Sequence, residues 1–349
     1  MIKTILLLSI CLLSLPSQGC YLLIQGTHLV SHQVRAERIE RKLADPDISE
    51  QTEAFLLLVE DIREFASGDL GLEGTRNYTS YVRTDRDYLV AVVSATQELS
   101  FTDHTWWFPI TGDVFYKGFF NPKGALREAA RLENRGYDTW ISKVTAFSSL
   151  GYFRTPLYSF MEDYAPSRLA DLIIHEQTHE TIWVKGQVAF NEELAVFVGN
   201  RGAELYIKER YGEDSQEYRD IFDLRHDREQ FSLSVAELRG QLDALYRSPL
   251  SDDEKRLRKE LTINRFQEQY AQTYHERFRT DRYLGFAQIP VNNAYISISS
   301  TYFSIRDIYE RLYAHAGGDL TAFIDLLRPL DGSREDPYAF MEELLSGAS

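Results

Sequence analysis

The spacing of apolar positions along the chain changes near residue 155. Before that point, short apolar runs stand between stretches that follow a helical period. Two helices are expected over residues 21–43 and 50–66, strands over 88–93 and 138–144, and paired strands over 106–120 around Thr111-Gly112. A further helix begins at Asn121-Pro122, and Gly136 ends it. Residues 76–87 show no useful alternation, and residues 145–154 are expected to be extended or looped.

After residue 155 the pattern is predominantly helical. Long charged helices, expected to form a solvated layer, lie over residues 201–211, 215–246 and 251–279. We therefore expect an α+β fold, with helices and a small mixed sheet region over residues 20–155 and a mostly helical region over 156–349. With 349 residues and 44% hydrophobic content, the chain can bury a substantial core, in one large domain or two closely joined ones.

Within the helical region, residues 175–179 read His-Glu-Gln-Thr-His. Residues four apart lie one turn apart on one helix face, so the imidazoles of His175 and His179 can bind one metal ion. Glu176 is rotated by about 100° from His175, which places its carboxylate beside the ion, where it can take a proton from water. The alternative is a fortuitous helical pattern, which would more often fall in a polar loop than after the apolar Leu172-Ile173-Ile174.

A catalytic zinc site needs a third protein ligand and leaves one coordination position open. The next helix is expected to begin at Asn191, a favourable N-cap. Glu192 then shares a face with Ala195 and Gly199, whose small size allows close packing against the first helix. We therefore predict Glu192 as the third ligand, with Glu193 as its substitute. Alternatively, both acids only stabilise the positive end of the helix.

This layout, with a second helix that carries Asn-Glu, resembles the glutamate-zincin metallopeptidases. The blocks that extend the resemblance along the chain are residues 108–120, 150–153, 175–179, 190–192 and 291–294. In order and spacing they resemble the bacterial putative aminopeptidase family of predicted zinc lipoproteins. The resemblance implies a glutamate-zincin-like fold, a zinc cofactor and peptidase activity. Glu193 is a departure, because that family usually has a small residue at this position.

Peptide hydrolysis makes further demands on the site. An aminopeptidase needs an acidic group for the free α-amine of its substrate, and Glu193 is the candidate. The developing oxyanion needs a hydrogen-bond donor, for which Tyr302 is the candidate near Asn292 and Asn293; with 21 tyrosines in the chain, packing is the alternative role. By the same resemblance, residues 145–153 would form an edge strand that pairs with an extended peptide, or else an ordinary strand or loop.

The charge balance argues against one class of partner. The formal net charge is -15, whereas a protein that binds duplex nucleic acid usually presents a basic surface. No nucleic-acid partner is therefore expected. The acidity suits a protein body that faces an aqueous compartment.

Residues 1–19 resemble a signal peptide. Lys3 supplies a positive charge, residues 5–15 form an apolar run too short to span a membrane comfortably, and Gly19 precedes Cys20. This resembles a bacterial lipoprotein signal, after whose cleavage Cys20 would carry the lipid. An ordinary signal peptide or an uncleaved anchor are the alternatives. Apart from Cys11 in the apolar run, Cys20 is the only cysteine, so no intrachain disulfide could form after cleavage.

The sequence thus predicts a metallopeptidase-like domain over residues 20–349. Its expected function is that of a zinc-dependent peptidase, by resemblance an aminopeptidase, that hydrolyses peptides in the bacterial cell envelope and is attached to a membrane by its N-terminal lipid. The rival prediction is a non-catalytic envelope lipoprotein in which zinc is a structural element of an interaction protein. A closed four-ligand site would favour the rival, and an open position beside Glu176 would favour the enzyme.

Overall fold

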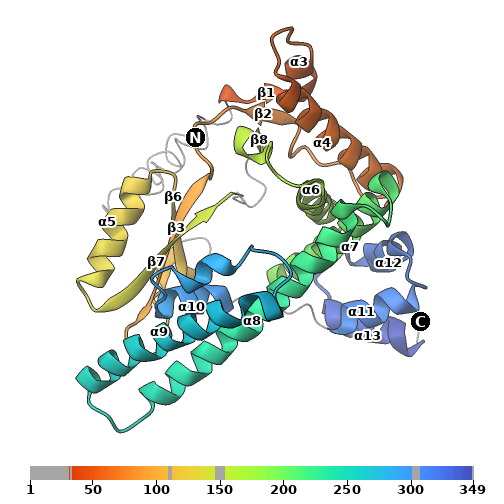
Figure 1. Cartoon of the computed structure of the whole chain (residues 1–349). Helices are drawn as coiled ribbons and strands as arrows, with labels where there is room; N and C mark the ends of the chain where they lie inside the picture. The colour runs from red at the N-terminus through yellow and green to blue at the C-terminus, as the bar shows by residue number, and fades with distance from the viewer. Residues whose placement is uncertain (1–30, 32–33, 109–111, 146–153, 301–306, 348–349) are drawn as a thin grey trace, which may run out of the picture.

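The computed structural model describes residues 31, 34–108, 112–145, 154–300 and 307–347 of the chain. This part has a mixed α+β fold, mostly helical with small sheets (Figure 1). Its strands end by Tyr158 and helices follow, which confirms the predicted order of elements. None of the helices in the described ranges combines the length and the apolar character that crossing a membrane requires.

A small sheet lies beside the first helices. Its elements and their neighbours are β1 (Glu37–Arg38), α3 (Ile39–Leu43), α4 (Glu50–Gly68), β2 (Ser80–Val82) and β8 (Leu157–Tyr158). β1 pairs antiparallel with β2, and β2 pairs parallel with β8. The helix predicted up to residue 43 is confirmed at residues 34–35 and in α3, but it is not continuous, because Glu37 and Arg38 pair with a strand some 40 positions later. Helix α4 forms as predicted, with Ser49 accepting a hydrogen bond from the Thr52 amide.

The second sheet has the order β6-β3-β7 and is antiparallel throughout. Its strands and the helices that cover it are β3 (Val90–Gln97), β6 (Tyr116–Phe119), β7 (Tyr137–Val144), α5 (Pro122–Glu133) and α10 (Asn293–Ser300). Ala91, Val93 and Ala95 face a core shared with α5. Thr96 points to the other face, where Asp103 accepts hydrogen bonds from it and from a serine of α10. Because both faces are covered, β3 is a nearly continuous buried run, as the sequence predicted.

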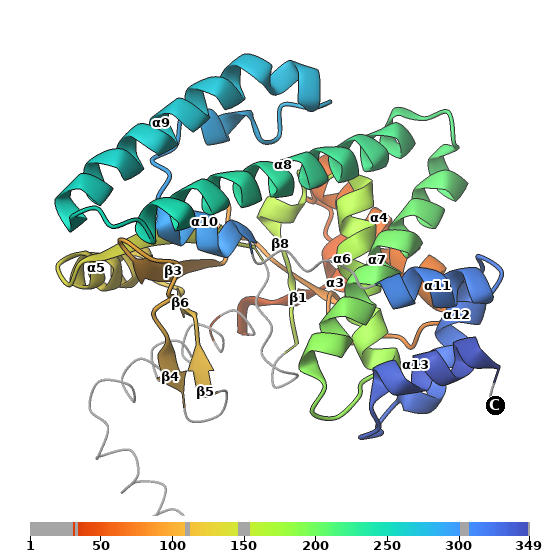
Figure 2. The ribbon, with the colours of Figure 1, turned by 90° about the horizontal axis from the view of Figure 1, so that it is seen from below.

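A separate two-stranded hairpin extends from this sheet (Figure 2). It consists of β4 (Trp106–Phe108) and β5 (Gly112–Val114), which pair antiparallel. Gly112 has a φ of +71°, a conformation that residues with a side chain rarely adopt. The pairing confirms the strands predicted around Thr111-Gly112, although residues 109–111 lie outside the described ranges.

The main core lies among helices. It includes α4 and the elements η1 (Ser159–Met161), α6 (Pro166–Thr181), α7 (Val188–Tyr211), α11 (Asp307–His315), α12 (Leu320–Leu327), η3 (Arg328–Leu330) and α13 (Pro337–Ser346). Helix α6 packs directly against α7 and α4. Figure 1 shows the C-terminal helices α11, α12 and α13 gathered beside α7. This core provides the rigid support for the site described below.

Two long antiparallel helices connect the helical core with the sheet (Figure 2). They are α8 (Gln216–Tyr246) and α9 (Asp252–Arg277), followed by η2 (Leu284–Ala287). Their bounds confirm the predicted helices, but the prediction of a solvated layer is only partly correct. Phe231, Val235 and Leu238 follow one face of α8 and pack with Phe266 and Tyr270 of α9 in a core of their own.

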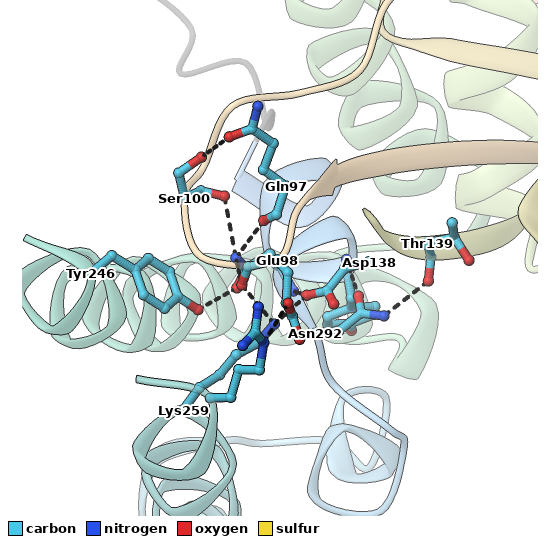
Figure 3. A network of polar contacts seen from close by, with 11 residues as sticks. Gln97, Glu98, Ser100, Asp138, Thr139, Tyr246, Lys259 and Asn292 are labelled. Atoms are coloured by element: carbon cyan, nitrogen blue, oxygen red, sulfur yellow. Dashed lines mark hydrogen bonds and ion pairs between the residues drawn. The ribbon is translucent and has the colours of Figure 1, made fainter. Parts of the chain in front are cut away.

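A buried polar network joins these helices to the sheet (Figure 3). The backbone amide of Asn293 donates to Asp138 at 2.8 Å, and Tyr246 donates to the Asn293 side chain at 2.7 Å. The Asn293 amide group in turn donates to the carbonyl oxygens of Gln97, Glu98 and Ser100. Lys259 of α9 pairs with Asp138 and donates to the Glu98 carbonyl. Asn293 thus connects helix α10 with the end of β3, with the loop that follows it and with helix α8.

Packing crosses the expected boundary at residue 155. Helix α4 precedes that residue but belongs to the same core as α6 and α7. Helix α10 follows it but packs on β3 and β7 of the sheet. The order of elements therefore separates the sheet region from the helical region more sharply than their packing does.

Candidate metal centre

Helix α6 carries the His-Glu-Gln-Thr-His motif in its last two turns. Pro166 occupies the first turn, where a proline fits without loss of a backbone hydrogen bond. The buried residues of the helix are Leu169, Ala170, Ile173, Ile174, Gln177, Thr178 and Thr181. They recur at helical spacing and face the main core, so His175, Glu176 and His179 lie on the adjoining, partly exposed face.

A glycine allows α7 to approach this face closely. A Cβ atom added at Gly199 would lie 2.8 Å from Oδ1 of Asp171, 3.0 Å from its carbonyl oxygen and 3.3 Å from Cβ of His175. No larger residue fits there without displacing α6. Glu192 lies two turns before Gly199 on the same face of α7. The close approach therefore brings its carboxylate to the two imidazoles of α6.

His175, His179 and Glu192 form a cluster of potential metal-binding side chains. The two Nε2 atoms lie 3.1 Å apart. Nε2 of His175 is 3.6 Å from Oε2 of Glu192, and Nε2 of His179 is 3.5 Å from Oε1. Ligand atoms at about 2.0–2.1 Å from a tetrahedral zinc ion would be separated by about 3.3 Å. The observed separations suit such an ion within a few tenths of an ångström.

Asn191 does not cap α7. The helix begins at Val188, and the predicted start at Asn191 is wrong. The Asn191 side chain instead accepts from the amide of Val184 at 2.9 Å and donates to its carbonyl oxygen at 3.0 Å. The helix can begin one turn earlier because the Asn191 side chain satisfies the backbone N–H and C=O groups of Val184, in the segment before the helix. The clamp fixes where α7 starts and hence where Glu192 points.

The charges of the cluster are coupled. Burial, together with the charge of His175, lowers the pKa of His179. Burial also acts to lower the pKa of His175, but its hydrogen bond with Glu192 and the nearby carboxylates outweigh this effect and raise it. The same hydrogen bond lowers the pKa of Glu192, which is therefore ionised at neutral pH. One carboxylate and an imidazole held neutral are the forms that bind a metal ion.

Glu176 lies beside the cluster and does not belong to it. Among the described residues, its carboxylate has no hydrogen-bond or ion-pair partner. Burial raises its pKa, and the neighbouring charge of Glu192 adds to the effect. A carboxylate with a raised pKa and free lone pairs has the properties of a general base.

The structure brings none of the other described site candidates to the cluster. Glu193 is only 6% exposed, and its carboxylate accepts a hydrogen bond from Tyr338 of α13 at 3.0 Å, so the structure does not bring it to the cluster. Asn292 donates to the carbonyl oxygen of Thr139 in β7, within the network of Figure 3. Cys20, Tyr302 and most of the expected edge strand over 145–153 lie outside the described residues.

Sequence reasoning missed three residues around the cluster. Asp171 precedes His175 by one turn, and its buried Oδ1 has no partner within the described ranges. Trp183 follows His179 by four residues, beyond the end of α6, and the centroids of their rings lie 5.4 Å apart. Helical spacing could have revealed Asp171. Tyr78 could not be found in this way: it is buried, has a φ of +55°, and the charge of Glu176 contributes to raising its pKa, after burial.

The chemistry of the residues present fits zinc. Two imidazole nitrogens and one carboxylate oxygen form a ligand set that zinc prefers, and three protein ligands are typical of its catalytic sites. In the described part of the chain, His175, His179 and Glu192 provide these three donors. The orphaned oxygen of Asp171 also lies close to His175, where an outer carboxylate commonly orients a ligating histidine.

Comparisons with known proteins agree with the family expected from the sequence. The model of the putative aminopeptidase family matches residues 20–337. No curated protein and no solved structure matches the chain significantly. The family assignment therefore rests on the match to the family model.

Proposed function

The chain belongs to the putative aminopeptidase family, and from this premise we propose that it is a zinc-dependent peptidase. His175, His179 and Glu192 would hold the zinc ion. The observation that carries the proposal is the separation of their ligand atoms, 3.1–3.6 Å, across two helices. The family name supports peptide hydrolysis, and the arrangement of the motif helix and a second Asn-Glu helix supports a glutamate-zincin-like site.

Bound in such a site, zinc supplies a Lewis acid that polarises a carbonyl group and lowers the pKa of water. Glu176 supplies the base. A carboxylate oxygen of Glu176 takes the proton from the attacking water and then passes it to the leaving amine. Its raised pKa makes it a competent acid after the first transfer, and both of its oxygens are available because none of the described residues bonds to them.

Two observations favour an enzyme over a structural zinc site. Structural sites are closed by four protein ligands, whereas the cluster found in the described ranges offers three. Glu176 stands beside it without a partner in the same ranges, as a base requires. The engagement of Glu193 with Tyr338 argues against a role for that residue in binding the substrate amine. A digest of a peptide library would show which bond of a peptide is cleaved.

Metal content tests the ligand set. The purified protein should carry about one zinc ion per chain. His179→Ala should lose it, because a two-ligand site binds zinc poorly. Glu192→Ala should weaken binding more than the neighbouring control Glu193→Ala. Zinc measured by atomic absorption after dialysis decides the matter: loss in the Glu193 variant with retention in the Glu192 variant would reject the proposed ligands.

The proposed place of action is the bacterial cell envelope, with the mature chain held to a membrane by a lipid on Cys20. The support is the charged start, the apolar run and the Gly19-Cys20 pair. Wild-type protein should fractionate with membranes and incorporate a labelled fatty acid, and Cys20→Ser should not. Cys11→Ser serves as the matched control. Equal labelling of wild type and Cys20→Ser would reject the proposed lipid on Cys20, and an ordinary export signal would then explain the N-terminal segment.

A further inference from the structure

The segment that follows α6 is extended, and its side chains point alternately into the main core and away from it. Ile182, which ends α6, has φ and ψ of -139° and 113°. Successive side chains of an extended segment point to opposite sides. Ile182 and Val184 are buried in the main core, so Trp183 points away from it and is 37% exposed. Its ring lies edge-on to the ring of His179, with centroids 5.4 Å apart.

Hydrogen bonds hold the backbone of this segment on two sides. The amide of Trp183 donates to Asp331, and its carbonyl oxygen accepts from the amide of Gly332, both at 3.0 Å. Asn191 holds both polar backbone atoms of Val184. The amide of Lys185 donates to the carbonyl oxygen of Ser333. An exposed indole on a fixed backbone is a pre-organised surface, so covering it costs little conformational entropy.

Resting on the proposed function, we propose that Trp183 forms one wall of the substrate site and receives a large apolar side chain, aromatic above all, of a residue that flanks the cleaved bond. The ring lies 5.4 Å from the ring of His179, so a peptide whose carbonyl group reaches the ion bound there has a side chain near that bond within reach of the indole. Aromatic rings bury large areas and pair favourably edge-to-face or offset.

The charges near the ring do not favour a basic side chain. Lys185 is exposed two residues after Trp183, and its ammonium group makes no ion pair with another described residue. The carboxylate of Asp331 accepts from the Trp183 amide, so a cation on the indole would meet charges of both signs. An aromatic side chain gains instead from the apolar area that it buries. We therefore expect phenylalanine to bind better than lysine at this position.

Binding can be measured apart from catalysis in full-length Glu176→Gln protein loaded with zinc. The ligands are a pentapeptide of alanines, five variants with one phenylalanine at each position, and the matching lysine variants. Calorimetry should show that phenylalanine at one position raises affinity by about 10-fold over alanine. Trp183→Ala should remove this gain, Trp183→Phe should keep part of it, and Trp107→Ala, which removes an indole that is 52% exposed on the hairpin, should leave it intact.

Three results would overturn the proposal: an equal phenylalanine gain in Trp183→Ala, an equal gain from lysine, or an equal loss of affinity for all peptides together with lost zinc. The last result would mean that Trp183 only positions His179. Cleavage of the same peptides by the wild-type protein tests the proposed function separately. A Trp183-dependent gain without any cleavage would reject the peptidase and keep the apolar site, whereas equal cleavage of all peptides would reject the wall and keep the peptidase.

Discussion

Gly199→Ala is the sharpest test of the packing that assembles the cluster. The added methyl group would meet the carbonyl oxygen of Asp171 at 3.0 Å and Cβ of His175 at 3.3 Å. The first is a backbone atom of α6 and the second is bonded to that backbone, so neither can rotate away. Since non-bonded heavy atoms prefer about 3.5–4.0 Å, the two helices must separate by roughly 0.5 Å.

The magnitude follows from two opposed terms. Overpacking of this kind costs about 1–3 kcal/mol. Alanine in place of glycine inside a helix recovers about 1 kcal/mol. Because the obstructing atoms belong to the backbone, the cost should lie near the upper end, and we expect a net loss of about 1–2 kcal/mol in the free energy of unfolding. Zinc affinity should fall too, because His175 and Glu192 move apart.

Two other glycines provide matched controls for this substitution. Gly240 lies inside α8, and a Cβ atom there would meet nothing within 4 Å, so Gly240→Ala should gain about 1 kcal/mol. Gly202→Ala should lose less than Gly199→Ala, because two of its three close contacts, Cδ1 of Ile174 and Cδ1 of Leu70, are side-chain ends that can rotate and none is backbone. Urea denaturation followed by tryptophan fluorescence measures the series. Equal stability of Gly199→Ala and Gly240→Ala would refute the argument.

Three further predictions follow from the site and its surroundings. Glu176→Gln should keep its zinc but lose about 10²–10⁴ of its peptidase rate, because an amide cannot accept the proton; full activity in a zinc-replete variant would reject the base. Asp171→Asn should weaken zinc binding by about 10–100-fold in chelator competition, since it removes the charge that faces His175, and unchanged affinity would exclude that contribution. Burial alone would raise the pKa of Glu128, but hydrogen bonds from Arg131 and Trp106 and the charge of Lys117 lower it from 4.5 to about 2. The ionised carboxylate therefore contributes its full stabilisation above about pH 4.5 and loses it as the pH falls toward 2. The urea midpoints of Glu128→Gln and wild type should converge over that pH range.

Local periodicity explains why much of the fold could be predicted from the sequence. Helices α4, α5, α8 and α9 each follow a side-chain cap and continue with helical spacing, both of which are visible in consecutive residues. Strand β3 was recognisable as an apolar run. β1, in contrast, is a strand because residues 80 and 81 lie opposite it, and no local pattern carries that information.

The sequence by itself determined that His175 and His179 face one point, because residues four apart on a helix share a face whatever surrounds it. It also determined that Glu192 and Gly199 share a face of the next helix. The tertiary structure decided how near the two faces come, through the contact of Gly199 with Asp171 and the clamp of Asn191 on Val184. It likewise drew Glu193 to Tyr338, 145 residues later in the chain. Helical geometry sets which residues point together over one turn, whereas distances between helices depend on contacts that no local pattern encodes.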